Sequence, residues 1–362
     1  MHILKSSSPI TTPGGVILPA GEWLLQDSNA FELALMADRG TVELSPWTNQ
    51  IWDMVKSGIG QNGLPAGVHN ESVQRVLIIR SGAIGDLLLF MPCLPALHAA
   101  YPNASITLSC FERHHAIFQQ EHLRLDEYPI RKSVAERFDL VIPLENIVEL
   151  STDKGQHATD AYAEALGVTV TDYKPVYKVT EEEKAFAIES YGTGKKRIAL
   201  QLHASTPIRD YPMQNWMAVM QELIKRGWEI MLLGNKDSIQ KLPPEIKDCS
   251  GLTFREAAAV LATCDVFCGV DSAFFNLCPA LGIPAVGLFG PVDWRTRIKV
   301  GGNTGQVALH GEADCCPCNW TNSRNGRRFP AHGPCATSGR CDPLAGVSPG
   351  RIVSVIEREA GT

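Results

Sequence analysis

From Val73 onward, short apolar runs alternate with longer segments in which apolar residues recur every three to four positions. Short continuous runs are typical of strands buried in a parallel sheet, and the longer segments are typical of helices that cover such a sheet. The pattern therefore predicts βαβ units. The first series contains the strand VQRVLIIR, a helix from Asp86 to Ala100, and the strands SITLSCF and FDLVIPL. Pro92 and Pro95 predict an interruption of that helix.

A second series with the same pattern begins at RIALQLHA, after an acidic stretch and the hinge-like YGTGKK. It predicts a helix from about Pro212 to Arg226, the strand EIMLLG, and a helix opened by Thr253 with Glu256 three residues later. The strand DVFCGV, a helix from Ser272 to Leu281 and the strand PAVGLFG follow. The chain is thus predicted to contain two Rossmann-like halves in tandem.

Residues 1–70 differ from the rest because their short segments are punctuated by Pro, Gly and Asp. They predict a small β-rich appendage, and the Gly- and Asn-rich stretch from Ser57 to Asn70 is typical of a linker. We therefore expect this appendage, a first Rossmann-like domain at 71–190 and a second at 191–362.

The composition narrows the class of protein. The 362 residues are 44% hydrophobic and 20% charged, as in ordinary globular proteins. A net charge of -6 argues against a nucleic-acid surface. With no run of 18 apolar residues and no export signal visible, we expect neither a transmembrane segment nor secretion, and place the chain in a reducing cytoplasm.

A glycine loop follows the first strand of the parallel series, in RSGAIGDLLLF. In an open parallel sheet, ligands bind at the carboxyl ends of the strands, so Gly82 and Gly85 are expected to let a substrate approach the backbone closely. No Lys-Ser or Lys-Thr pair follows, so this is not a Walker loop. Asp86 opens the next helix, whose positive end favours an ionised general base. The alternative is an ordinary helix-start carboxylate.

Several separated motifs resemble one family. RVLIIRSGAIGDLLLFMPCLPALHAAYPNASITL resembles the opening of glycosyltransferase family 9, the heptosyltransferases. LQLHASTPIRDYPMQNWMAVMQELIKRGWEIMLLG and CGVDSAFFNLCPALGIPAVGLFGPVDW are similar to its donor-binding domain, so the resemblance covers about 73–345. It implies a GT-B fold, in which two Rossmann-like domains face each other across a cleft. It also implies inverting transfer of a sugar from a nucleotide diphosphate without a catalytic metal.

The resemblance also assigns roles to residues. The catalytic carboxylate falls on Asp86, which would take the proton of the acceptor hydroxyl. Arg209 stands where the family usually has Lys, and either cation can neutralise a diphosphate leaving group. The alternative for Arg209 is a surface ion pair. The implied donor-binding residues are His203, Ser205, Arg209, Asp271, Ser272, Asn276 and Gly290.

The chain departs from the family pattern after the strand DVFCGV. The family reads Asp-Ser/Thr-Gly with a His three residues after the Gly, whereas this chain has Ala273 and Asn276 there. Alanine does not reproduce a glycine that needs positive φ or very close contact, and Asn has no ionisable imidazole. Asp271 is therefore either a donor ligand or only a helix cap. Both donor identity and activity depend on these departures.

The late cysteines form the third candidate site, a finger at about 314–342. A C-x-x-C pair with two later thiolates predicts a structural tetrahedral metal site, for which sulfur ligands fit zinc or iron. Cys316 is expected to be the spare thiol, and His332 is a possible substitute ligand. Free or oxidised thiols are the alternative. The expected ligands are Cys315, Cys318, Cys335 and Cys341.

The resemblance implies a glycosyltransferase with ADP-heptose as its first expected donor. The acceptor would be a hydroxyl of a glycan, a lipopolysaccharide core or a protein, with the enzyme in the cytoplasm or at the inner face of the membrane. Two basic clusters, Arg113-His114-His115 and the arginines at 324, 327 and 328, could face an anionic acceptor or be solvated surface. A non-catalytic binding or assembly component is the competing hypothesis. An NAD-dependent oxidoreductase is disfavoured because no clean G-x-G-x-x-G is present.

Overall fold

The computed structural model forms two compact units, and each is composed of several stretches of chain. Unit 1 comprises Met1–Ala83, Cys93–Ile147 and Tyr162–Val170, and unit 2 comprises Ile84–Pro92, Val148–Ala161 and Thr171–Thr362. The expected domain boundary at 190/191 does not coincide with this division. The last stretch of unit 2 begins at Thr171, and unit 2 also includes two segments from earlier in the chain. The structure describes residues 2–11, 17–25, 43–46, 72–118, 123–145, 147–148, 155–194, 196–234, 243, 245–302, 304–311, 313, 315–318, 335 and 340–361.

The N-terminal segment contains strands, as its punctuated pattern predicts. Strands β1 (His2–Ser6), β4 (Gly21–Leu25) and β5 (Glu43–Pro46) form an antiparallel sheet in the order β4-β1-β5. Strands β2 (Ile10–Thr11) and β3 (Ile17–Leu18) form a separate antiparallel pair. The expected linker at 57–70 lies outside the described residues.

This small sheet is attached to the rest of unit 1 through β4. The backbone N–H of Leu24 donates to the carbonyl of Ile130 at 2.8 Å, and the Arg131 guanidinium lies over the Trp23 ring at 4.8 Å from its centroid. Leu24 is fully buried in a core with Leu77 and other residues of the parallel sheet. Strand β4 therefore contributes to the core of unit 1.

The main sheet of unit 1 is parallel, with the order β8-β7-β6-β9. Its strands are β6 (Arg75–Ile79), β7 (Ser105–Cys110), β8 (Arg124–Glu127) and β9 (Leu140–Pro143). The sequence RLDE of β8 has no apolar run, so only the other three strands were predictable from hydrophobicity. Unit 1 also contains η3 (Glu112–Phe118), α5 (Lys132–Ala135) and the part of α7 (Ala158–Leu166) from Tyr162 onward.

The helix after β6 is interrupted, which confirms the effect expected of Pro92 and Pro95. It consists of α3 (Ile84–Phe90), a 3₁₀ turn η2 (Met91–Cys93) and α4 (Leu94–Ala100). Proline removes a backbone donor and clashes with the preceding turn, so a continuous helix is disfavoured there. Helix α3 belongs to unit 2, and α4 belongs to unit 1.

Unit 2 contains a six-stranded parallel sheet in the order β12-β11-β10-β13-β14-β15. The central strands β10 (Arg197–Gln201), β11 (Glu229–Leu233), β13 (Val266–Val270) and β14 (Ala285–Phe289) match the predicted apolar runs. The two edge strands, β12 (Ile246–Asp248) and β15 (Gln306–His310), are shorter or less apolar and were not predicted.

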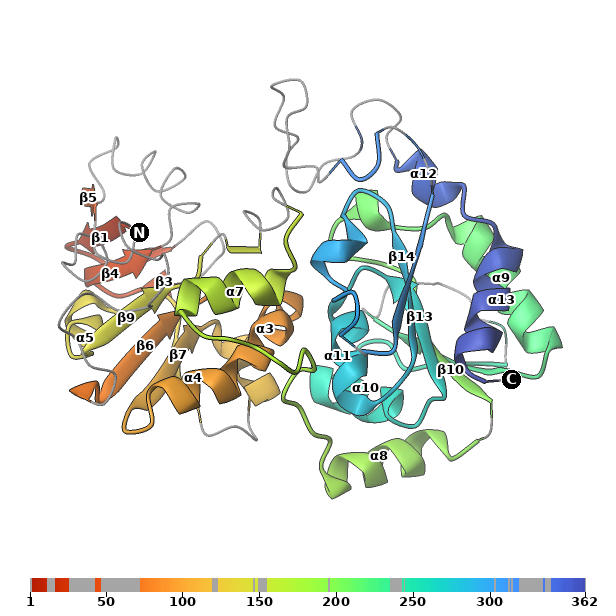
Figure 1. Cartoon of the computed structure of the whole chain (residues 1–362), viewed down its shortest axis with the longest axis horizontal. Helices are drawn as coiled ribbons and strands as arrows, with labels where there is room; N and C mark the ends of the chain where they lie inside the picture. The colour runs from red at the N-terminus through yellow and green to blue at the C-terminus, as the bar shows by residue number, and fades with distance from the viewer. Residues whose placement is uncertain are drawn as a thin grey trace. The chain divides into compact units, whose positions relative to one another are not determined.

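Helices cover both faces of this sheet. Figure 1 shows α9 and α13 on one face and α10 and α11 on the other. Thr253 and Glu256 form the predicted capping box at the start of α10. The fully buried Trp216 of α9 packs in a core that includes Ile352 and Ile356 of α13. The bounds are α8 (Glu181–Tyr191), η4 (Pro207–Arg209), α9 (Met213–Lys225), α10 (Phe254–Leu261), α11 (Ala273–Leu281), η5 (Trp294–Thr296), α12 (Asp342–Ala345) and α13 (Pro349–Glu359).

The fit at Gly269 in β13 gives a test of this packing. A Cβ atom there would lie 2.8 Å from both the Gln201 carbonyl oxygen and a ring carbon of Phe267. Gly269→Ala should lower the free energy of unfolding by about 1–3 kcal/mol, measured by urea denaturation. Gly350→Ala is the control, because a Cβ meets nothing within 4 Å at that helical position. Equal stability of Gly269→Ala and the native chain would contradict this packing.

Candidate functional site

The first residues of the glycine loop after β6 lie in unit 1 and are held by a buried ion pair. Arg80 Nη1 lies 3.4 Å from Glu145 Oε2, and their side chains are 2% and 6% exposed. Glu145 Oε1 also accepts the backbone N–H of Ser81 at 2.6 Å. A Cβ at Gly82 would lie 2.7 Å from the Arg80 guanidinium, so glycine is needed for this close approach. The pair fixes the first residues of the loop.

The second half of the loop belongs to unit 2 and contains Asp86. This carboxylate lies in the first turn of α3, as predicted. The carbonyl of Gly85, one residue earlier, accepts a hydrogen bond from Asn276 Nδ2 of α11 at 3.3 Å. A Cβ at Gly85 would lie 3.4 Å from the same nitrogen. The structure therefore brings Asn276 into contact with the residue next to Asp86.

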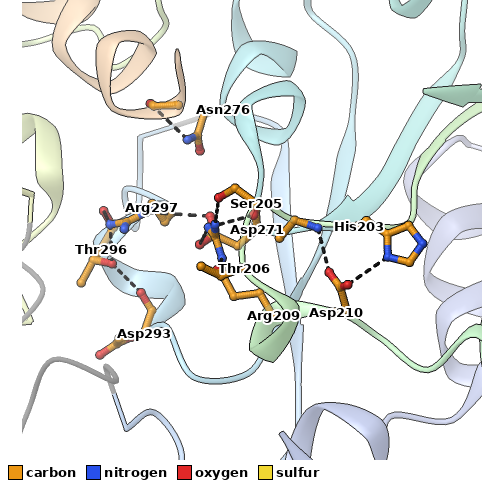
Figure 2. Close-up of polar contacts among 12 residues, drawn as sticks. His203, Ser205, Thr206, Arg209, Asp210, Asp271, Asn276, Asp293, Thr296 and Arg297 are labelled. Carbon is orange, nitrogen blue, oxygen red and sulfur yellow. Dashed lines mark hydrogen bonds and ion pairs between the residues drawn. The ribbon is translucent and has the colours of Figure 1, made fainter. Parts of the chain in front are cut away.

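Arg209 is the most highly connected of the predicted residues (Figure 2). Its Nη1 donates to the carbonyl oxygen and to Oδ2 of Asp271, both at 3.2 Å. Its Nε donates to Thr206 Oγ1 and its Nη2 to Ser205 Oγ, both at 2.6 Å. The side chain is only 17% exposed, which excludes the alternative of a solvated surface ion pair. The segment after β10 and the segment after β13 are thus joined by one guanidinium.

Asp271 forms ion pairs with two arginines and is not the N-cap of α11. The N-cap of α11 is Ser272, and Asp271 directs its carboxylate to Arg209 instead. Arg297 Nε lies 3.8 Å from the other oxygen, Oδ1. The Ser272 hydroxyl is buried and has no hydrogen-bond partner within the described part of the chain.

His203 forms a second polar contact at the end of β10. Its Nδ1 lies 2.9 Å from Asp210 Oδ2, and Asp210 Oδ1 accepts the backbone N–H of Ala204 at 2.8 Å (Figure 2). This carboxylate fixes the orientation of the imidazole ring. The segment from His203 to Asp210 is therefore held by two carboxylates, Asp210 and Asp271.

A group that the sequence analysis missed lies beside these residues in unit 2. The His157 ring is hydrogen-bonded to the Arg297 carbonyl, and the backbone N–H of Thr159 donates to His157 Nδ1 at 3.2 Å. Burial lowers the pKa of His157 to about 4, so the ring is neutral at pH 7. His157, Asn276 and Arg297 line a small cavity together. The basic run WRTRIK contains Arg297 and is the sequence signal that could have pointed to this group.

The same region contains an ion pair between Lys299 and Asp160. Lys299 Nζ lies 2.5 Å from Asp160 Oδ2, and the Tyr173 hydroxyl donates to Asp160 Oδ1 at 2.6 Å. Burial alone would raise the pKa of Asp160, but the hydrogen bonds from Lys299 and Tyr173 outweigh it and lower the pKa. The turn that carries Arg297 is therefore fixed on both sides.

The cysteine segment contains a contact between two of its thiols. Cys316 is hydrogen-bonded to Cys341, which raises the pKa of Cys316 and lowers that of Cys341. Cys316 Sγ also lies 2.6 Å from the Gly290 carbonyl oxygen, to which it can donate, and its expected role as the spare thiol stays a prediction. Cys315 is exposed. In the parts of the chain that the structure describes, no three His, Cys, Asp or Glu residues form a group that could hold a metal.

Other predicted residues lie apart from the Arg209 network. A Cβ at Gly290 would meet Cys341 Sγ at 2.7 Å, so Gly290 packs against the cysteine segment. In the basic run after β7, Arg113 lies over the Phe111 ring and His114 is buried, so this run is not simply a solvated patch. Residues 324, 327, 328 and 332 lie outside the described residues. No helix among the described residues is long and apolar enough to cross a membrane.

Comparison with protein families and curated proteins gives a consistent result. The profile of glycosyltransferase family 9 (heptosyltransferase) matches residues 130–326. Lipopolysaccharide heptosyltransferase 3 of Escherichia coli is 27% identical to this chain over 122 residues, which make up 30% of this chain and 36% of that protein. The match thus spans little more than a third of that relative's length.

Solved structures match more of the chain. E. coli ADP-heptose lipopolysaccharide heptosyltransferase II covers 79% of this chain and 98% of its own, with a TM-score of 0.57 and 14% identity. The iron-containing dodecameric glycosyltransferase TibC of enterotoxigenic E. coli covers 100% and 93%, with a TM-score of 0.63 and 11% identity. TibC in complex with ADP-D-beta-D-heptose gives a TM-score of 0.60 at 11% identity, over 99% of this chain and 90% of that one. The expected α/β fold of the GT-B class is confirmed.

The buried His157 predicts a pH dependence of stability. Its pKa is about 4 when folded and 6.5 in the unfolded reference, so between these values only the unfolded chain binds the extra proton. The free energy of unfolding should therefore fall by about 1.4 kcal/mol per pH unit as the pH drops through this window. His157→Gln should reduce the loss between pH 7.5 and pH 5 by about 2 kcal/mol, measured by urea denaturation. A pH dependence of His157→Gln equal to that of the native chain would contradict the assignment.

Proposed function

The chain belongs to glycosyltransferase family 9, the heptosyltransferases, and from this premise we propose that it transfers a sugar from a nucleotide diphosphate to a hydroxyl group. The observation that carries the proposal is the fixed guanidinium of Arg209 at the carboxyl end of β10. This edge of a parallel sheet is where such folds bind nucleotides, and a guanidinium is suited to the oxygens of a diphosphate.

The proposed donor is ADP-heptose. It is the compound bound in the TibC structure, and it appears in the description of heptosyltransferase II. Arg209 would offset the negative charge that develops on the diphosphate as the bond to the sugar breaks. The backbone N–H groups at the start of α11 and the Ser272 hydroxyl, which has no partner among the described residues, would provide further donors to phosphate oxygens.

Asp86 is proposed as the general base. It lies in the first turn of α3, directly after the glycine loop, and its carboxylate would accept the proton of the acceptor hydroxyl. The acceptor hydroxyl would attack the anomeric carbon from the side opposite the diphosphate, which inverts the configuration. Neither step requires a metal ion.

The acceptor is proposed to be a hydroxyl of a glycan, a lipopolysaccharide core or a protein. The curated relative carries lipopolysaccharide in its name, whereas the match with TibC covers 100% of this chain. The proposal retains the expected cytoplasmic location, at the inner face of the membrane if the acceptor is attached to a lipid.

A structural metal ion in the cysteine segment is a further part of the proposal. TibC is described as iron-containing, and the contact between Cys316 and Cys341 shows that two thiols can meet here. The proposed role of this ion is structural, and no step of the proposed transfer is assigned to it. The proposed ligands are Cys315, Cys318, Cys335 and Cys341. Cys316, next to Cys315, is the alternative to Cys315 as the fourth ligand. Four thiolates would leave no open position for a substrate.

Removal of the proposed base tests the reaction directly. Asp86→Asn should lower the turnover number with ADP-heptose by about 10²- to 10⁴-fold, or roughly 3–5 kcal/mol, while donor affinity changes little. Transfer is measured as ADP release and donor affinity by calorimetry. Asp172→Asn, at an exposed position, is the control. Near-native turnover of Asp86→Asn would refute its role, and a native chain that forms no product from any nucleotide sugar would support a non-catalytic component.

Elemental analysis tests the metal proposal. Protein purified under reducing conditions should contain close to one zinc or iron per chain, and Cys318→Ser should lower both metal content and melting temperature. Cys93→Ala, outside the cysteine segment, should retain the metal. Loss of metal in Cys316→Ser but not in Cys315→Ser would make Cys316 the fourth ligand, and metal-free native protein would refute the proposal. Brief treatment with EDTA should leave the transfer rate unchanged.

A further inference from the structure

Arg297 shares the buried carboxylate of Asp271 with Arg209. Arg209 contacts Oδ2 at 3.2 Å, and Arg297 Nε lies 3.8 Å from Oδ1 (Figure 2). The Asp271 side chain is 5% exposed, and that of Arg297 is 11% exposed. Two guanidinium groups therefore face this single buried carboxylate, which can neutralise the charge of only one of them.

The hydrogen bonds of Arg297 are also incomplete for so buried a guanidinium. Within the described residues, Arg297 donates through Nη1 only, to the hydroxyl and the carbonyl of its own neighbour Thr296 at 2.9 and 3.4 Å. A guanidinium has five N–H donors in a planar fork that matches the oxygens of phosphates and carboxylates. None of its nitrogens is among the fully buried atoms that lack a partner in the described residues, so the remaining donors are accessible to an anionic partner from solvent.

The turn that carries Arg297 is held in place by groups that do not use its side chain. The His157 ring is hydrogen-bonded to the backbone carbonyl of Arg297. Lys299, two residues after Arg297, forms an ion pair with Asp160. The position of the guanidinium is therefore set by the surrounding structure rather than by Asp271 alone. Such preorganisation lowers the entropy that would be lost on binding a ligand.

We propose that Arg297 is a second diphosphate-binding residue, which acts together with Arg209 on the donor. Asp271 serves as the counterion of both arginines while no donor is bound. A diphosphate has the multiple negative charges that two guanidinium groups can neutralise, whereas the one carboxylate neutralises only one of them. The inference deepens the proposed function and rests on a nucleotide diphosphate donor.

Calorimetry with inorganic pyrophosphate, ADP, UDP and adenosine tests this role. Arg297→Gln should bind pyrophosphate and ADP about 10- to 100-fold more weakly, as expected for the loss of a charge-assisted hydrogen bond. Adenosine binding and the melting temperature should change little, because Asp271 keeps Arg209 as its partner. Arg295→Ala is the matched control, since Arg295 lies in the same turn, is 59% exposed and pairs with Asp293. It should bind all four compounds as the native chain does.

The outcomes separate the inference from the proposed function. A native chain that binds neither ADP, UDP nor pyrophosphate overturns both. Native binding that Arg297→Gln leaves unchanged overturns only the role of Arg297, and so does an equal loss for adenosine and pyrophosphate. If Arg297→Gln does not fold, Arg297→Lys retains the charge but not the planar fork. Its pyrophosphate binding must then be weaker than native for the inference to stand.

Discussion

The contact between Arg209 and the buried carboxylate of Asp271 is the interaction on which the candidate site depends. It joins η4, after β10, to the end of β13, two segments about sixty residues apart in the chain. A carboxylate in the interior is costly unless it is paired, and removal of one partner of a buried pair is strongly destabilising. The same carboxylate also lies against Arg297, so the relative positions of three loops at the edge of the sheet follow from one buried charge.

The central elements of the fold could be predicted because their hydrophobic patterns are strong. The runs in β10, β11, β13 and β14 are buried on both faces, and Thr253 with Glu256 marked the start of α10. The edge strands were missed for a physical reason. A strand such as β8, with the sequence RLDE, is held by its backbone hydrogen bonds to β7, which no pattern of side chains reports.

Residues of the candidate site could be predicted only where they belong to a local sequence motif. Ser205, Arg209 and Asp271 follow strand ends, and the structure brings them together. Gly290 also follows a strand end, but its neighbours are Cys316 and Cys341, which no spacing rule reveals. Arg297 was missed because its importance comes from the tertiary contact with Asp271, in a turn whose sequence shows only basic residues.

The interleaved path of the chain has a consequence for any attempt to divide it. Helix α3 belongs to unit 2, although the residues before and after it belong to unit 1. A fragment that begins at residue 191 would lack α3 and lose the Gly85 carbonyl that accepts a hydrogen bond from Asn276. It would thereby expose the surface of α11 that α3 covers, with apolar residues such as Leu87 and Leu88 removed from their buried positions. A cut at residue 191 therefore does not yield a complete unit 2. A gene fusion or exchange that uses unit 2 would have to include α3.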